Sequence, residues 1–307
     1  MSEARYSANS AERIYNITVL KGKCLNYNQE LLAVICDKFD LPPEFAGSTF
    51  FTAMSDVLDV LLFIFLNEEV SASLEKRGPL GDILAKSIER HYTESDHTYL
   101  SYCDDIQHMF SKRVDFVIGS CLLDFTVSSF SVFEKWVCSA YEEVRQRRKS
   151  SNKKIAKLRK MIGKYNSITV SSPEKELALK RIMDNRSSYI SGFEKINFTM
   201  SKVDHNYLRE KQKDLETIEM YSKMRNTIHN LGIHINKQQY ASNTNNCRAK
   251  LEPGKAYYTD TYSHNIHLCN ELVEIYKAMI CSLDLCSLSS LIELGDRDTL
   301  ENQTIFK

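Results

Sequence analysis

Apolar residues recur along most of this chain at intervals of three and four positions, which is the spacing of one face of an α-helix. Polar stretches that contain glycine or proline separate these runs. The periodic segments predict helices over 28–38, 48–70, 80–92, 98–112, 114–148, 155–165, 174–190, 204–230 and 265–292. Ser48 or Thr49, Pro173 and Asp204 are expected to begin three of them. The pattern therefore predicts an all-α fold, arranged as a helical bundle.

One segment departs from the helical pattern. Near 232–258, Ile233 and Ile235 alternate with polar residues, and a second run, RAKLEPGKAYYTDT, follows the polar stretch ASNTNN. Alternation with a period of two residues is typical of a strand that has one buried face. We therefore expect a small β-hairpin, or a structured loop, inserted between the last two helices.

The 307 residues, of which 43% are hydrophobic, are enough for one or two domains. Residues 1–112 carry no recognisable chemistry and are interpreted as an N-terminal helical region of unknown role. A helical bundle is expected over 113–293, with the aromatic residues of 116–141 packed in its core. The polar residues 294–307 are expected to fray.

Charge and cysteine content limit which classes of protein this chain can belong to. Forty bases balance forty acids, so no global field draws the chain to a polyanion. The nine cysteines are odd in number and form no CxxC pair, which is typical of a reduced, intracellular protein. No apolar stretch follows the first charged residues, so no signal peptide is predicted. These features predict a cytoplasmic location.

The most apolar stretch is 57–66. It is shorter than the roughly 20 apolar residues that cross a bilayer, and Asp59 interrupts it. We therefore interpret it as a core helix and expect no membrane contact.

Several common catalytic motifs are absent, including GxGxxG, the P-loop, HExxH and GxSxG. His264, His267 and Cys269 lie close together in sequence, but their spacing matches no structural zinc motif. They are interpreted as residues at the beginning of a helix. Neither a metal ion nor an organic cofactor is expected.

The informative segment is Tyr221–Asn230, YSKMRNTIHN. On a helix, Arg225 and His229 lie one turn apart and share a face. Leu208, Leu215, Ser222 and His229 are each seven positions apart, and Ile218 and Arg225, also seven apart, interleave with them. Arg225 and His229 are therefore expected to continue the apolar stripe of their helix. A guanidinium and an imidazole on a packing face are costly unless they are paired or line a groove.

This pair of residue types suits phosphodiester chemistry. Arginine holds a phosphate through two parallel hydrogen bonds, and histidine moves a proton near pH 7. Asn226 adds a neutral donor and acceptor beside them. The set fits metal-independent RNA cleavage, in which the 2′-hydroxyl attacks the adjacent phosphate. The alternative is structural, because basic side chains in the last turn of a helix are favoured by about 0.3–1 kcal/mol.

The stretch MRNTIHNLGIHI resembles the Arg-Asn…His motif of the HEPN superfamily. The resemblance covers 114–290, with an aromatic helix ending FEKWVCSAYEE, a basic middle, the motif helix and a closing helix. In the family the arginine and histidine are usually separated by more residues than the three, 226–228, found here. The resemblance implies that Arg225, Asn226 and His229 are catalytic residues acting on RNA.

The same resemblance implies a homodimer, in which two motif helices meet and both Arg–His pairs line one cleft. Many family members are ribonucleases of stress, toxin or phage-defence systems, so an antitoxin or another protein partner is expected. Glu134 would orient Arg225, as acidic residues on the first bundle helix do in the family; the alternative is a plain surface acid. Tyr221 and Ser222 would form the cleft wall, unless Tyr221 is a core residue.

A basic run follows the aromatic helix, with ten bases and no acid between Arg145 and Lys164. Such a local positive field would grip the RNA backbone without reading its sequence. The alternative is a solvated helix face. The predicted RNA-binding residues are Arg145, Arg147, Arg148, Lys149, Lys153, Lys154, Lys157, Arg159 and Lys160.

The sequence leaves two functions open. The first is a HEPN-like, metal-independent endoribonuclease, with Arg225 and His229 converging in an open groove. The alternative is a non-catalytic HEPN-like protein that binds nucleic acid or a protein partner and has a regulatory role. In that protein the two side chains would be buried against another helix or capped.

Overall fold

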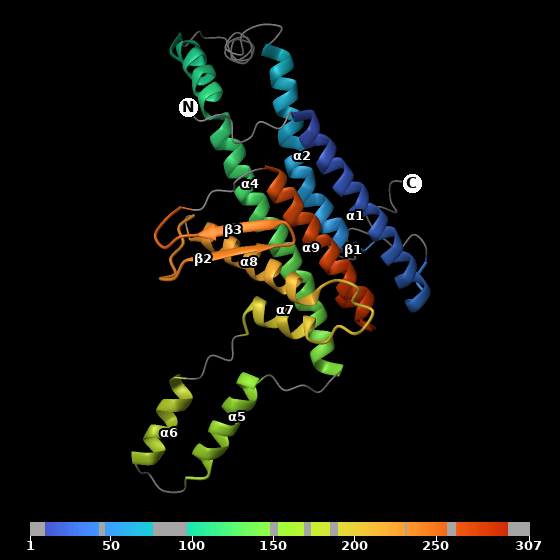
Figure 1. The fold of residues 1–307 in the computed structure, drawn as a ribbon, viewed down its shortest axis with the longest axis vertical. Coiled ribbons are helices and arrows are strands. Elements are labelled where there is room, and N and C mark those ends of the chain that lie inside the picture. The colour runs from blue at the N-terminus through green and yellow to red at the C-terminus, as the bar shows by residue number, and fades with distance from the viewer. Residues whose placement is uncertain are drawn as a thin grey trace.

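The computed structural model describes residues 10–42, 47–75, 97–147, 153–168, 173–184, 190–230, 232–256 and 262–293. These are mostly helical, so the all-α prediction is confirmed (Figure 1). The bundle consists of α1 (Ser10–Phe39), α2 (Phe50–Glu75), α4 (His97–Arg147), α7 (Gly192–Met200), α8 (Lys211–His229) and α9 (Tyr262–Ser282). Two further helices, α5 (Lys153–Asn166) and α6 (Pro173–Asp184), form a separate hairpin.

The long helix α4 is the centre of the bundle. In Figure 1, α1, α2 and α9 run alongside it, and α7 and α8 cross its lower half. It contacts α2, α7, α8 and α9 directly, while α1 packs on α2 and α9. Every other helix of the bundle therefore packs against α4 or against a neighbour of α4.

Aromatic rings from distant parts of the chain meet in one hydrophobic core. Phe50 stacks on Tyr276 with ring centroids 3.9 Å apart, which joins α2 to α9. Phe130 stacks on Tyr221 at 5.4 Å, which joins α4 to α8. Phe133 is fully buried, so aromatic residues of α4 pack in the core, as their spacing predicted.

The predicted division at residue 112 does not separate two structural units. Helix α4 runs without a break from His97 to Arg147, which joins the predicted segments 98–112 and 114–148. Buried residues of α1 and α2 belong to the same core cluster as those of α4 and α9. The predicted helix 80–92 and the tail 294–307 lie outside the described residues.

Other helix boundaries differ from prediction for local reasons. Helix α1 begins at Ser10 rather than at 28, because buried positions such as Ile17 and Cys24 continue its stripe upstream. Helix α8 begins at Lys211 rather than at Asp204, whose carboxylate instead accepts the backbone N–H of Asn206 at 2.8 Å in a loop turn. Helix α9 ends at Ser282, and a short 3₁₀ turn, Leu288–Ser290, follows.

Two predicted helix starts are confirmed. The hydroxyl of Thr49 accepts the backbone N–H groups of Phe51 and Thr52, at 3.1 and 3.2 Å, so it caps α2. Pro173 is the first residue of α6. A two-residue strand, β1 (Ser48–Thr49), pairs with β4 (Ile292–Glu293) just before α2.

The predicted β-hairpin is confirmed as β2 (Tyr240–Thr244) and β3 (Cys247–Leu251). Asn245 and Asn246 form its turn with φ of 47° and 59°, which asparagine tolerates better than most residues. Ile235, part of the alternating signal, lies outside the strands and is 69% exposed. The alternation at Ile233 and Ile235 was therefore the wrong signal, and the asparagine pair marks the turn.

Within the described residues, one segment, Phe50–Asn67, is long and apolar enough to cross a membrane, with a mean hydropathy of 1.7. One face of this helix packs in the core, as expected for a core helix, through Phe50, Phe51, Met54, Leu58, Leu61 and Phe65. Its outer face keeps Val60 and Phe63 exposed. A cytoplasmic location stays a prediction.

Among the described cysteines, the buried and the exposed ones differ in expected reactivity. Burial raises the pKa of the Cys24 and Cys247 thiols to about 12, whereas Cys281 and Cys286 are exposed. Because the thiolate is the nucleophile, we expect N-ethylmaleimide at neutral pH to label Cys281 and Cys286 in the folded protein. Cys24 and Cys247 should react only after denaturation. Peptide mass spectrometry would measure this, and equal labelling of Cys24 and Cys281 before denaturation would contradict it.

Candidate functional site

The accessible end of α8 carries the predicted catalytic residues. Arg225 is half-buried, and Asn226 and His229 are exposed. The buried face of α8 consists of Asp214, Thr217, Ile218, Met220, Tyr221, Met224 and Thr227. The three predicted residues therefore lie on the edge of the helix that stays in contact with solvent.

The predicted apolar stripe through His229 is wrong. Leu208, its first member, precedes α8 and is 91% exposed, so counting in sevens from it sets the wrong phase. The packing of α8 against α4 and the β-hairpin rotates the buried face away from His229. The histidine thus needs neither a buried partner nor a groove to be tolerated.

Arg225 is held from two sides. Its Nη2 lies 3.5 Å from Oε2 of Glu134 on α4, and its Nη1 donates to Oδ1 of Asn226 at 3.1 Å. The Glu134–Arg225 contact is the one that the HEPN resemblance implied. Nε of Arg225 is buried and has no hydrogen-bond partner within the described part of the chain. The guanidinium, which carries five N–H donors, is therefore oriented but not saturated.

The N-terminus of α7 lies against the Glu134 carboxylate, a placement that the sequence pattern did not predict. Gly192 is the first residue of α7, and a Cβ added there would lie 1.6 Å from Oε1 of Glu134. Ser191 and Glu194 cap this helix reciprocally, with Glu194 N–H donating to Ser191 Oγ at 3.2 Å. The partial positive charge of a helix N-terminus favours a carboxylate beside it. The Ser-x-x-Glu spacing was the signal that could have located this helix start.

Substitution of Gly192 tests this placement. In Gly192→Ala the new methyl group must shift the end of the Glu134 side chain, so we expect the protein to lack the gain of about 0.5–1 kcal/mol that alanine otherwise brings to a helix. Gly22→Ala is the matched control, because it lies inside α1 with no atom within 4 Å of its Cβ, and it should gain about 0.5–1 kcal/mol. Thermal unfolding of both variants measures the difference. A Gly192→Ala protein that gains stability as Gly22→Ala does would contradict the contact.

Tyr221 is a core residue, the alternative to a cleft wall that the sequence left open. It is fully buried, and its hydroxyl lies 2.7 Å from the Ser129 hydroxyl. Ser222, its neighbour, is half-buried. The cleft-wall interpretation is therefore wrong for Tyr221.

The motif stretch contains a second histidine with a different role. His234, at the start of the hairpin segment, is 3% exposed. Its Nε2 donates to the backbone oxygen of Gln238 at 3.1 Å, and its Nδ1 lies 3.2 Å from the Thr227 hydroxyl. It ties the end of α8 to the hairpin, so the exposed His229 is the histidine of this stretch that can meet a ligand.

The predicted basic patch is not continuous. Arg145 pairs with Glu142 at 2.8 Å, and Arg147 pairs with Glu143 at 2.6 Å. Arg147 also donates to the backbone oxygen of Asp284 at 2.5 Å. Arg147 therefore joins the end of α4 to the segment after α9, whereas Arg145 pairs within α4. RNA binding by these two arginines stays a prediction.

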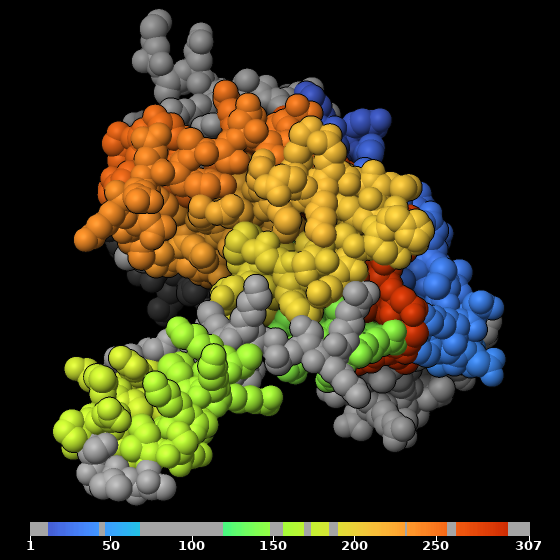
Figure 2. Space-filling view, turned by 60° about the horizontal axis from the view of Figure 1, so that its bottom comes forward, coloured from blue at the N-terminus to red at the C-terminus, as the bar shows by residue number. Residues whose placement is uncertain are grey.

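The remaining bases belong largely to α5. Lys157, Arg159 and Lys160 are exposed there. The side chains of Lys153 and Lys154, like the whole of Arg148 and Lys149, lie outside the described part of the chain. Figures 1 and 2 show α5 and α6 projecting from the bundle below α7. RNA binding by these bases stays a prediction.

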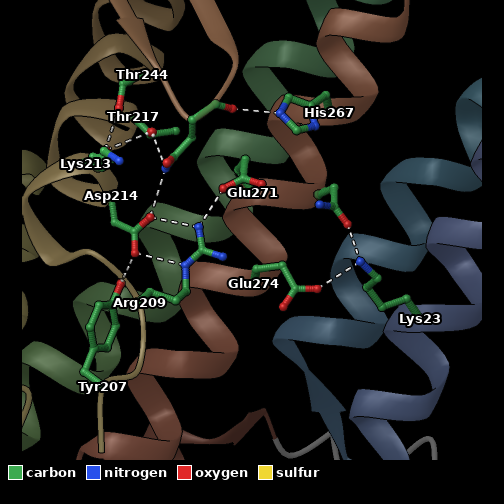
Figure 3. Close-up of polar contacts among 12 residues, drawn as sticks. Lys23, Tyr207, Arg209, Lys213, Asp214, Thr217, Thr244, His267, Glu271 and Glu274 are labelled. Carbon is green, nitrogen blue, oxygen red and sulfur yellow. Dashed lines mark hydrogen bonds and ion pairs between the residues drawn. The ribbon is translucent and has the colours of Figure 1, made fainter. Parts of the chain in front are cut away.

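A buried polar network lies at the other end of α8 (Figure 3). Asp214, 1% exposed, accepts from Tyr207 at 2.6 Å, from Nε of Arg209 at 2.9 Å and from Asn245 at 3.0 Å. Arg209 also donates to Glu271 of α9 at 2.6 Å. Burial, together with the hydrogen bond to Asp214, raises the pKa of the Tyr207 phenol. The network joins the loop before α8, the hairpin turn and α9, and its groups satisfy one another.

His267 and Cys269, which were considered for metal binding, contact other groups of the protein. His267 donates through Nε2 to the backbone oxygen of Asn245 at 2.8 Å. Cys269 is buried 3.5 Å from the sulfur of Met54. In the part of the chain that the structure describes, no group of three or more His, Cys, Asp or Glu residues could hold a metal ion.

Comparison with known proteins identifies no relative. No family model matches the chain, and no curated protein or solved structure is significantly similar to it. The HEPN resemblance therefore rests on the Arg-Asn…His motif and the helix plan, and it stays a prediction.

Proposed function

We propose that this chain is a metal-independent endoribonuclease whose site is the exposed end of α8. One observation carries the proposal. A half-exposed guanidinium, oriented by Glu134 and Asn226, lies one helical turn from the exposed imidazole of His229. His229 is exposed and Arg225 is only half-buried, so a ligand can reach both side chains from solvent.

The chemistry assigns one role to each residue. Arg225 binds the scissile phosphate and stabilises the charge that develops on it. The ribose 2′-oxygen forms a bond to phosphorus while the bond from phosphorus to the 5′-oxygen breaks, which leaves a 2′,3′-cyclic phosphate and a 5′-hydroxyl. His229 acts as the general acid or base in this proton transfer, and Asn226 positions the phosphate or the ribose.

The site is open, and a second copy of the chain would complete it. His229 is exposed in the last turn of α8, where a symmetric partner can approach. In the homodimer that the HEPN resemblance implies, two such helix ends meet and form one cleft. Water exclusion and a second set of donors would then come from the partner.

The test is cleavage of mixed cellular RNA in EDTA by the purified full chain, beside His229→Ala and Arg225→Ala. Cleavage to ends that carry cyclic phosphate, lost in both variants, supports the proposal. Equal inertness of all three proteins, each folded and of the same oligomeric state, would overturn it. The ion pair that Arg225 already makes with Glu134 would then favour the second candidate function, a non-catalytic binding protein.

A further inference from the structure

The α5–α6 hairpin has no core of its own. No side chain described in either helix is buried, whereas the bundle holds many residues with no exposure at all. The main contacts of each helix are with the other, and Figure 2 shows the pair standing away from the bundle. Short helices are marginally stable in water unless they bury an apolar face. The hairpin therefore has more apolar surface to bury than its two helices bury between them.

A hollow of about 250 Å³ lies between α5 and α6. Its apolar lining, here called the floor, is formed by Met161, Ile168, Leu177 and Ala178. Its charged lining, here called the rim, is formed by Lys164, Arg181 and Glu174. Leu177, at the floor, is 50% exposed. The hollow thus combines an apolar surface that is open to solvent with a mainly cationic edge.

The charge on α5 selects the kind of occupant. This helix carries six bases and no acid, and α6 carries three of each. A second copy of the hairpin would bring nine bases and three acids against the same set, so like charges would predominate. An RNA backbone would contact the bases but leave the apolar floor in water. A flat lipid surface would not enter a concave hollow, because interfacial helices bury a convex apolar face.

We infer that the α5–α6 hairpin is a docking arm for an acidic amphipathic helix of a partner protein. The partner's apolar stripe would fill the hollow against Met161 and Leu177, as in other helix-in-groove complexes. Its flanking carboxylates would meet Lys164 and the exposed bases of α5. Docking would convert the hairpin into a three-helix unit with a buried centre. This inference does not depend on the proposed ribonuclease activity.

The test uses the full chain and a synthetic helical peptide of about 18 residues, with leucines on one face and glutamates elsewhere. A scrambled peptide of the same composition is the control for charge alone. We expect the amphipathic peptide to bind more tightly in fluorescence anisotropy. It should also slow hydrogen exchange in α5 and α6, which would show that the arm is the binding site.

Two variants of α6 separate the apolar contact from charge. Leu177→Gln, at the floor of the hollow, should weaken peptide binding roughly 10-fold or more. Leu179→Gln is the matched control, because Leu179 is similarly exposed at 42% but does not line the hollow. Both positions are on the surface, so both variants should fold. RNA cleavage at α8 is the independent readout and should be unchanged in both.

Other results would overturn the inference. Equal affinity for the amphipathic and scrambled peptides would leave only nonspecific charge attraction. Binding of an RNA oligonucleotide or of phosphatidylserine vesicles that Lys164→Glu abolishes and Leu177→Gln leaves intact would assign the arm to a phosphate surface. Self-association of the chain that Leu177→Gln abolishes would assign the hollow to a second copy.

Discussion

Replacing Asp214 by alanine is expected to lower the free energy of unfolding by about 3–5 kcal/mol. The carboxylate is buried and accepts from Tyr207, from Arg209 and from Asn245. Without it, Arg209 keeps only Glu271 as a described partner, and the Tyr207 hydroxyl loses the acceptor to which it is bonded at 2.6 Å. Removing one member of a buried charge pair costs more than the pair contributes, because the other charge stays desolvated.

Urea denaturation of the full chain measures this loss. Asp204→Ala is the matched control, since Asp204 is exposed ten positions earlier and its carboxylate is hydrogen-bonded within its own turn, to Asn206. The control should stay within about 0.5 kcal/mol of wild type. If Asp214→Ala were no less stable than Asp204→Ala, the network would not hold α8 in place.

The network also bears on the proposed site. It fixes the first half of α8 to α9 and to the hairpin turn, while the Glu134–Arg225 contact fixes the other end of α8 to α4. The two anchors together set the position of the helix that presents His229. Loss of Asp214 is therefore expected to disturb the site through the helix, and not through direct contact.

The fold was predictable where local pattern decides it. Apolar spacing along α2 and α4, the Thr49 cap and the Pro173 start are features of neighbouring residues, and the structure confirms them. The asparagine turn of the hairpin is equally local. In each case the physical cause lies within a few positions of the residue that shows it.

What was missed depends on residues that are distant in sequence. Arg209 and Glu271 meet only because α9 packs on α8, and no spacing rule links them. The Glu134–Arg225 contact was anticipated only through the HEPN resemblance, and the role of Gly192 beneath it was not anticipated. The phase of the α8 stripe failed for the same reason, because tertiary packing chooses which residues of a helix are covered.

The basic run shows a further limit of sequence reasoning. Its ten bases suggest one patch, yet acids just before the run on α4, and one acid that is distant in sequence, pair with its first members. Glu143 pairs with Arg147, and Asp284, beyond the end of α9, lies beside the same arginine. The described bases of α5 are exposed on an arm whose separation from the bundle the charge pattern does not reveal.

The largest functional effect is expected at the end of α8. His229→Ala should reduce RNA cleavage by at least ~10²-fold, the typical contribution of a positioned acid or base. Arg225→Ala should reduce it by a similar factor, because the phosphate loses its cationic donor. His229 is exposed, so its removal should change stability by no more than about 0.5 kcal/mol. A loss of cleavage in His229→Ala would therefore not come from unfolding.

Two controls isolate this effect. His205→Ala removes an exposed histidine that lies before α8, and Lys223→Ala removes a cation of α8 that pairs with Glu219 at 2.7 Å. Both should cleave RNA as wild type does. A contaminating ribonuclease would give the same activity in all preparations. EDTA inhibits contaminating enzymes that need a metal ion. If Lys223→Ala lost as much cleavage as Arg225→Ala, general positive charge on α8 would explain the activity, and the specific roles of Arg225 and His229 would fall.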